Sequence, residues 1–308
     1  MKILLVGPNP LLLSGLGKAM REVGPRLAAR HEVVIAAAGA ADAVFSRWTA
    51  PEGLPPMLGW HEYHVGEDPA RSAGTLVLAI ETVRPDVVLL LGSPRSFMGL
   101  PIVRQACLER DGGGAKDRPF RAPRFVLWAS IWLEPFPVAL APVMDAADRL
   151  LATSEWGRAM WACGQPRWRA KLVEPGIGDV FHPQPAVARA MKDRYTIGWV
   201  GSNDVRNHPV AALEAFQTAR DRVDGLEGAA LIMKTPARGG LDLAEWCDRL
   251  GLTWTAEGPG HEADVYFMEG RLPEADMPKL YGQFDLGLVT QARSDLGQAA
   301  REMAACGV

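Results

Sequence analysis

Residues 281–308 read YGQFDLGLVTQARSDLGQAAREMAACGV, and this stretch predicts a strand, a turn and a helix. The strand, 284–290, is a short and mostly apolar run of strand-forming residues, typical of a strand buried on both faces of a parallel sheet. Asp295 is the predicted N-cap of the helix and forms a capping box with Gln298, three residues later. Gly307 is predicted to end the helix.

The start of this helix is suited to a negatively charged ligand. Backbone N–H groups at Leu296, Gly297 and Gln298 would lack partners inside the helix, and Gly297 lets a ligand approach the backbone closely. Glu302 lies five residues past Gly297, where a carboxylate can accept hydrogen bonds from sugar hydroxyls. The alternative for Glu302 is a solvated helix glutamate, because isolated charges are mostly surface groups.

Length and composition set the general class. A chain of 308 residues with 48% hydrophobic content can bury a large core and predicts two domains. The net charge of -3, with both signs interspersed, argues against nucleic acid and against an anionic membrane as partners. No apolar run is long enough for a transmembrane helix. The four cysteines have neither disulfide nor metal spacing, which favours a reducing, cytoplasmic location.

The first part of the chain alternates predicted strands and helices. This alternation predicts a doubly wound parallel sheet, whose ligands bind beyond the carboxyl ends of the strands. Residues 38–68 are predicted to be irregular or a hairpin. The predicted strands are 2–6, 32–37, 86–91, 124–131 and 149–153, and the main helices are 18–29, 69–83, 96–109 and one capped by Ser154.

Two loops of this first part are candidate ligand contacts. The sequence SGLG, with Ser14, Gly15 and Gly17, precedes a predicted helix, where backbone amides can meet a phosphate or a sugar hydroxyl. A purely structural turn is the alternative. The sequence WLEPFP, with Trp132 and Glu134, is a rigid aromatic and proline turn expected at the ligand cleft. His61 and His64 are three residues apart with no third ligand nearby, so we predict no metal there.

The second part of the chain repeats the α/β alternation after a proline-rich crossing. The crossing reads PGIGDVFHP at 175–183, and we predict domains at 1–182 and 195–308 joined by a linker at 183–194. The second domain begins with a strand, 195–200, that ends in GSNDVRNHP at 201–209. The cations Arg206 and Lys234 follow the first two strands of this domain.

The chain resembles the glycosyl transferases group 1 family, which are retaining glycosyltransferases with the GT-B fold. Family members have a glutamate, seven residues and a second glutamate in the donor segment, followed by a run that contains Met, Ala, Cys and Gly. The matching residues here are Leu296, Gly297, Glu302, Met303, Ala304, Cys306 and Gly307. The family's interdomain crossing is matched approximately by Ser154, Pro175, Gly178, Asp179, Phe181 and Pro183.

This resemblance implies two Rossmann-like α/β domains that face a cleft and an enzyme that moves a sugar from a nucleotide-diphosphate donor to a glycan, lipid or protein acceptor. It implies retention, independence of metal and no cofactor besides the nucleotide-sugar. No Asp-x-Asp sequence is present to hold a metal. The implied donor-binding residues are Gly201, Arg206, Lys234, Arg271, Leu272, Leu296, Gly297, Gln298 and Glu302, and the acceptor side is the pair of loops described above. Glu302 is the implied catalytic-site carboxylate.

Three positions depart from the family pattern. Ser294 stands where the first glutamate is expected, and the neighbouring Asp295 is a candidate to take the role of that glutamate, so both are included among the candidate catalytic residues. Ser202 and Asn207 replace two expected cations. These changes keep open a non-catalytic, sugar-nucleotide-binding or scaffold protein of the same fold, besides an epimerase or phosphorylase. The sequence also stops where relatives continue, which predicts a truncated second domain whose exposed sheet edge favours a homodimer.

Overall fold

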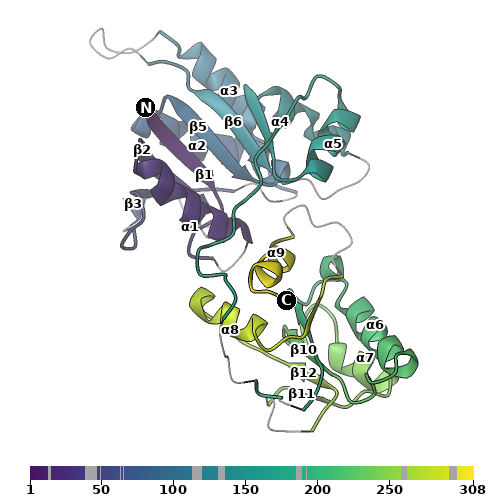
Figure 1. Cartoon of the computed structure of the whole chain (residues 1–308). Helices are drawn as coiled ribbons and strands as arrows, with labels where there is room; N and C mark the ends of the chain where they lie inside the picture. The colour runs from purple at the N-terminus through teal and green to yellow at the C-terminus, as the bar shows by residue number, and fades with distance from the viewer. Residues whose placement is uncertain are drawn as a thin grey trace. The chain divides into compact units, whose positions relative to one another are not determined.

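The computed structural model divides the chain into two compact units, Met1–Pro175 and Gly176–Val308 (Figure 1). It describes residues 1–12, 15–38, 47–48, 50–62, 64, 66–112, 120–130, 136–184, 189–191, 193–257, 262–290 and 297–308. The domain and linker boundaries predicted from the sequence, at 182 and 195, remain predictions. None of the described helices combines the length and the apolar composition that a membrane crossing requires.

The first unit is built on an eight-stranded sheet in the order β3-β4-β2-β1-β5-β6-β7-β8. All neighbouring strands are parallel except β3 and β4, and β1 lies between β2 and β5, where the direction of winding reverses. The strands are β1 Lys2–Gly7, β2 Glu32–Ala38, β3 Arg47–Trp48, β4 Met57–Trp60, β5 Val87–Gly92, β6 Arg124–Ala129, β7 Arg149–Ala152 and β8 Lys171–Leu172.

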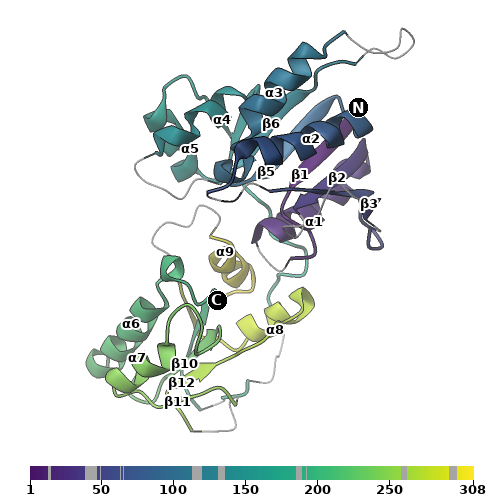
Figure 2. The ribbon, with the colours of Figure 1, turned by 180° about the vertical axis from the view of Figure 1, so that it is seen from behind.

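Alternate side chains of β1 enter two different apolar cores. Leu4 and Val6 pack with α2 and α3, whereas Ile3 and Leu5 pack with α1 on the opposite face. Figures 1 and 2 show these helices on the two faces of the sheet. The helices are α1 Gly15–Ala28, α2 Pro69–Val83, η1 Pro94–Phe97, α3 Leu100–Glu109, η2 Val138–Leu140, α4 Ala141–Asp145 and α5 Glu155–Gly164.

Local sequence signals account for the best-predicted helices. Asp68 caps α2 by accepting from the Ala70 N–H at 2.9 Å, and Pro69 occupies the first helical position. Ser154 caps α5 as predicted, with its Oγ 2.9 Å from the Gly157 nitrogen. Each cap satisfies one amide that the helix itself leaves without a partner.

One prediction for the first unit is wrong, and another had two alternatives. Of the alternatives for residues 38–68, the hairpin is confirmed at 47–60, where β3 and β4 pair antiparallel. Strand β4 is buried throughout and also pairs with β2 in parallel. The fully buried Trp60 fixes this strand by stacking on Phe97, with ring centroids 5.7 Å apart. Helix α1 begins at Gly15 rather than at residue 18, so Gly15 and Gly17 lie inside its first turn.

The second unit contains a five-stranded, fully parallel sheet in the order β11-β12-β10-β9-β13. The strands that follow β9 in sequence first add to one of its sides, and β13 then adds to the other. The winding of the sheet therefore reverses between β9 and β13. The strands are β9 Thr196–Val200, β10 Ala230–Lys234, β11 Trp254–Thr255, β12 Val265–Phe267 and β13 Leu286–Leu288.

Helices cover both faces of this sheet as well. Ile197 and Trp199 of β9 face one core, shared with α6 and α7, and Ile232 and Tyr266 face another, shared with α8 and α9. The second core also takes in Phe181 of the crossing. The helices are η3 Val205–Asn207, α6 Pro209–Arg222, α7 Leu243–Arg249, η4 Glu274–Asp276, α8 Met277–Tyr281 and α9 Gln298–Ala305.

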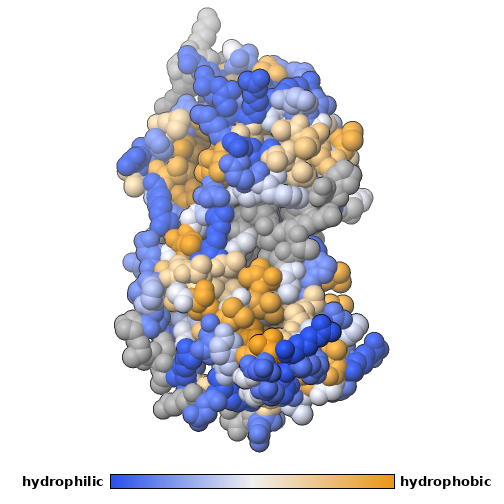
Figure 3. Space-filling model, turned by 45° about the vertical axis from the view of Figure 1, so that its right-hand side comes forward, coloured by the Kyte–Doolittle hydropathy of each residue, from blue (hydrophilic) through white to orange (hydrophobic). Residues whose placement is uncertain are grey.

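The composition of strand β13 predicted burial on both faces, and this prediction is wrong. It pairs only with β9 among the described strands, and Leu286 is 48% exposed and Val289 46% exposed. Figure 3 shows apolar side chains, in orange, on the visible face of both units. An apolar run alone does not distinguish an edge strand from a central one, because both present at least one buried face.

Gly198 in β9 is a position where a side chain would not fit. A Cβ there would lie 2.0 Å from Cδ2 of Phe284, whose ring is 4% exposed. We expect Gly198→Ala to reduce the free energy of unfolding of the second unit by about 1–3 kcal/mol, as overpacking does. Urea denaturation followed by circular dichroism measures this change.

The matched control is Gly228→Ala, because an added Cβ there meets no atom within 4 Å. If Gly198→Ala were as stable as Gly228→Ala, the close packing of Phe284 on β9 would be disproved.

Candidate functional site

The carboxyl edge of the second sheet gathers most of the predicted donor residues. Loops leave this edge after β9, β10, β12 and β13, and the reversal of winding lies between β9 and β13. In doubly wound sheets the strands on either side of such a reversal send their following loops apart, which opens a crevice for ligands.

Helix α9 follows β13 and carries Glu302. The helix begins with Gly297 as its N-cap, in the left-handed conformation with φ 50° and ψ 31°, so the prediction of Asp295 as N-cap is wrong. Glycine adopts this conformation without the steric cost of a side chain. The predicted residues Ser294, Asp295 and Leu296 lie outside the described residues, and Gln298 is the first residue of the helix.

The predicted end of α9 is confirmed. Gly307 has a φ of 86°, its N–H donates to the Ala304 carbonyl, and the Val308 N–H donates to the Met303 carbonyl at 3.1 Å. These two bonds define a Schellman motif, which ends the helix at the glycine.

Glu302 is a buried residue and not a solvated helix glutamate. It is 8% exposed, and its Oε2 accepts a hydrogen bond of 2.7 Å from the hydroxyl of Tyr281. Tyr281 is itself fully buried, between the rings of Phe181 and Phe284, whose centroids are each 6.1 Å from its own. Burial raises the pKa of Tyr281, and the nearby charge of Glu302 raises it further, so the phenol remains the donor.

The loop after β9 holds Gly201 and Arg206. The guanidinium of Arg206 forms an ion pair of 2.8 Å with Asp204, which also accepts from the Arg206 N–H. The side-chain hydrogen bond from Arg206 lowers the pKa of Asp204 to about 2. A depressed pKa means that the pair is fully formed above about pH 4, the ordinary range of an aspartate, and is lost as the pH falls through about 2.

Ser202 and Asn207 bind each other. They stand at the two positions where the resemblance to group 1 glycosyl transferases led us to expect cations. The Asn207 amide donates to the Ser202 Oγ at 2.7 Å and to its carbonyl at 2.9 Å. The Asn207 carbonyl accepts from Thr290 Oγ1 at 2.8 Å, and Thr290 accepts from the indole of Trp199 at the same distance. This network joins the loops that follow β9 and β13.

Lys234 and the turn at 270–272 lie together at the ends of β10 and β12. The Lys234 ammonium donates to the carbonyls of Met268 at 3.1 Å and Gly270 at 2.5 Å. Burial lowers the pKa of this ammonium. Arg271 is exposed, and Leu272 packs against the core that contains Tyr281.

The predicted acceptor-side residues lie only partly within the described chain. Gly15 is exposed and Gly17 buried in the first turn of α1, while Ser14, Trp132 and Glu134 lie outside the described residues. His61 is 4% exposed and its Nε2 is 2.8 Å from Glu67 Oε2. Across the described ranges, no three His, Cys, Asp or Glu side chains gather as metal ligands.

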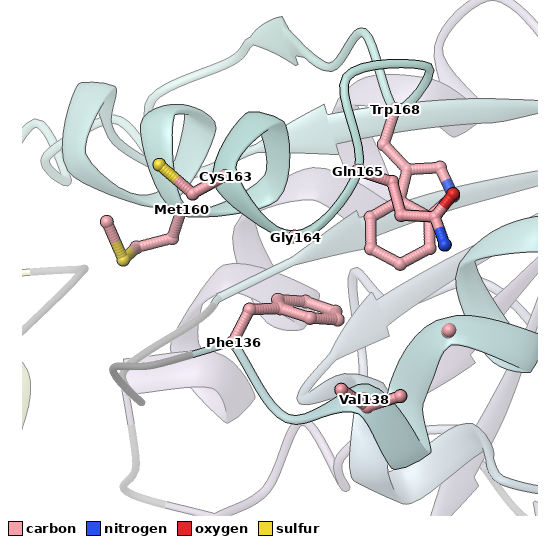
Figure 4. Close-up of a pocket in the computed structure, with 8 residues that line it drawn as sticks. Phe136, Val138, Met160, Cys163, Gly164, Gln165 and Trp168 are labelled. Atoms are coloured by element: carbon pink, nitrogen blue, oxygen red, sulfur yellow. The ribbon is translucent and has the colours of Figure 1, made fainter.

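Sequence reasoning missed an apolar pocket of about 350 Å³ in the first unit (Figure 4). Its lining includes the rings of Phe136 and Trp168, whose centroids are 5.0 Å apart. Of its lining, only Phe136 belongs to a segment predicted as a ligand contact, the WLEPFP turn. The lining residues are Phe136, Val138, Ala141, Met160, Cys163, Gly164, Gln165 and Trp168.

A second hollow, of about 610 Å³, lies beside residues that precede the strands of the second sheet. Arg194 extends along it and donates to the carbonyls of Gly228, Ala229 and Ala263. Arg220 pairs there with Asp264 at 2.9 Å. The cations of this hollow are therefore engaged in holding the unit together.

Comparison with protein-family models gives no match, and comparison with curated proteins gives none either. Solved structures do match over nearly the whole chain. One is described as trehalose-6-phosphate from E. coli bound with UDP-2-fluoro glucose, with a TM-score of 0.70, 13% identity, and coverage of 99% of this chain and 82% of that chain. Sucrose-phosphate synthase from Thermosynechococcus elongatus matches with a TM-score of 0.70 and 13% identity. The match covers 100% of this chain and 80% of that chain.

An alpha,alpha-trehalose-phosphate synthase (UDP-forming) from Burkholderia vietnamiensis is also similar, with a TM-score of 0.68, 12% identity, and coverage of 99% of this chain and 81% of that chain. At these identities the likeness establishes the fold. The chain has the GT-B fold, with two Rossmann-like α/β units, and the predicted fold class is confirmed.

Asn203 connects two loops of the candidate site. Its amide donates to the carbonyls of Pro236 and Leu241, and its Oδ1 accepts from the Leu241 N–H at 3.0 Å. We expect Asn203→Ala to reduce the free energy of unfolding by about 1–3 kcal/mol, because it leaves backbone groups without their partners.

Thermal and urea denaturation measure this loss, with Asp224→Ala, an exposed position of the same unit, as the control. Equal stability of the two variants would show that Asn203 does not hold the loops.

Proposed function

We propose that this chain is a glycosyltransferase that moves a sugar from a nucleoside-diphosphate donor to an acceptor, with retention of configuration and without a metal. The observation that carries the proposal is the buried carboxylate of Glu302, on the helix that follows β13, beside the reversal of winding in a GT-B fold. Two similar solved structures are described as sugar-phosphate synthases, one of them UDP-forming, and a third is described as trehalose-6-phosphate bound with UDP-2-fluoro glucose.

The proposed donor site uses charge and backbone groups of the second unit. Transfer leaves negative charge on the departing diphosphate, and preorganised cations and amides lower the barrier by stabilising it. We assign this role to Arg206, Lys234 and the first turn of α9 after Gly297. The turn at 270–272 would lie against the base, and Glu302 would accept hydrogen bonds from the ribose. The acceptor would approach Gly15 and Gly17 in the first unit.

The first experiment is a thermal-shift screen of the chain with UDP-, GDP- and ADP-sugars. A donor that raises the melting temperature is then tested for release of nucleoside diphosphate, with and without sugar and sugar-phosphate acceptors. The proposal expects one nucleotide to stabilise the chain and an acceptor to accelerate its release. If none of the three classes bound, the proposed function would be overturned.

Glu302→Ala is expected to weaken binding of the selected nucleoside diphosphate by about 1–3 kcal/mol, the usual loss for a hydrogen bond to a charged group. Isothermal titration calorimetry measures the affinity, and circular dichroism checks that the variant is folded. Glu214→Ala, on the exposed face of α6, is the matched control. An affinity of Glu302→Ala equal to that of the control would move the donor site elsewhere.

Metal removal and product stereochemistry test the mechanism. We expect the transfer rate to be unchanged by an excess of EDTA, because the cations Arg206 and Lys234 take the place of a metal at the diphosphate. Proton NMR of the product is expected to show the anomeric configuration of the donor. Activity that EDTA abolishes and Mg²⁺ restores would refute metal independence, and an inverted product would refute retention.

A second candidate function is a sugar-nucleotide-binding protein without transferase activity. The pairing of Ser202 with Asn207 favours it, because two neutral side chains that bind each other stand at the positions from which cations would reach a diphosphate. Each missing charged contact costs about 1.5–3 kcal/mol of stabilisation. Donor binding without hydrolysis or transfer in the assays above would support this candidate over the enzyme.

A further inference from the structure

Tyr281 and Glu302 form a buried polar pair between two helices of the second unit. Tyr281 ends α8 and Glu302 lies in the middle of α9, 21 residues away in sequence. The hydroxyl is 2.7 Å from Oε2, and the exposed fractions of the two residues are 0% and 8%. A carboxylate that leaves water at such a place requires partners, because desolvation disfavours its charged form.

The position of the tyrosine hydroxyl is determined by packing. Phe181 contacts one side of the Tyr281 ring and Phe284 another, and both phenylalanines are themselves buried. Phe284 in turn lies against the backbone of β9 at Gly198. The ring is fully buried among these groups, so the place from which its hydroxyl donates is set by the core.

The direction of proton donation is also settled. Burial and the charge of Glu302 both raise the pKa of Tyr281, so the phenol keeps its proton and the carboxylate oxygen accepts. One oxygen of Glu302 is thereby held by a fixed donor. Because a carboxylate is planar, fixing one oxygen on a packed side chain also orients the second.

We propose that Tyr281 is a positioning residue, which orients the carboxylate of Glu302 so that it accepts hydrogen bonds from the ribose hydroxyls of the donor nucleotide. This inference rests on the proposed function and adds to it a residue that selects ribose over deoxyribose. Orientation matters here because a hydrogen bond weakens steeply when its angle departs from linear. The other role for the pair is purely structural, as a brace between α8 and α9.

The two roles differ in what they predict for ribose recognition. A brace contributes equally to binding of every nucleotide, with or without ribose hydroxyls. A positioning residue contributes only when the hydroxyls are present. The informative quantity is therefore the ratio of affinities for a nucleoside diphosphate and its 2′,3′-dideoxy counterpart, measured for each variant.

The experiment measures this ratio by calorimetry with UDP, GDP or ADP, whichever the screen selects, and with the matching dideoxynucleotide. We expect the intact chain to prefer the ribonucleotide by about tenfold or more, as loss of a hydrogen bond to a charged group implies. Tyr281→Phe removes one oxygen and is expected to lower this preference by roughly three- to tenfold. Glu302→Ala is expected to abolish it.

Tyr266→Phe is the matched control. Tyr266 is 3% exposed in the same unit, and its hydroxyl accepts from the Ala263 N–H at 3.1 Å and from Arg194 at 3.2 Å. The same chemical change there lowers stability but is expected to keep the ribose preference. Glu302→Gln offers its single oxygen to Tyr281 and presents an NH2 group, which cannot accept, to the ribose, so it is expected to lose the ribose preference as Glu302→Ala does.

The outcomes separate the two proposals. If the intact chain binds none of the nucleotides, the proposed function fails and this inference with it. If the intact chain binds with a ribose preference that Tyr281→Phe retains, only the positioning role is refuted. If Tyr281→Phe does not fold, Glu302→Asp takes its place, because the shorter side chain keeps the charge but withdraws it from the Tyr281 hydroxyl, and an undiminished ribose preference of that chain refutes the positioning role.

Discussion

The contact of the Phe284 ring with the bare backbone of Gly198 is the constraint on which the second unit depends. It brings the segment before β13 onto the face of β9, and the same ring bounds Tyr281 at the end of α8. Tyr281 then reaches Glu302 on α9. The absence of a side chain at Gly198 is therefore linked, through two packed aromatic residues, Phe284 and Tyr281, to the carboxylate at the candidate site.

Around this core, the loops of the candidate site are held by neutral and charged contacts of different strength. Asn203 and the network of Ser202, Asn207 and Thr290 bind backbone groups that would otherwise lack partners, so they define loop shape. The ion pair of Arg206 with Asp204 is more exposed, and such pairs contribute little to stability. An arriving anion can therefore compete for Arg206 at small cost, whereas reshaping the loops would break several hydrogen bonds, three of them part-buried.

Short-range signals made most of the fold predictable. The cap of α2 at Asp68, the cap of α5 at Ser154 and the end of α9 at Gly307 follow from local chemistry that needs no tertiary partner. Strand β4, the exposure of β13 and the burial of Glu302 depend instead on what lies beside each segment. A single glutamate on a helix has no pattern that reveals a buried tyrosine 21 residues earlier, and the pocket at Phe136 joins residues from three separate segments.

The crossing between the units has a consequence for how such chains diversify. Phe181 and Met191 belong to the core of the second unit, and Arg194 donates to three backbone carbonyls just before strands β10 and β12. Recombination that exchanged second units between relatives at the start of β9 would leave this core without part of its lining. A viable exchange would have to carry the segment from Gly176 onward, so the crossing is inherited with the half that it stabilises.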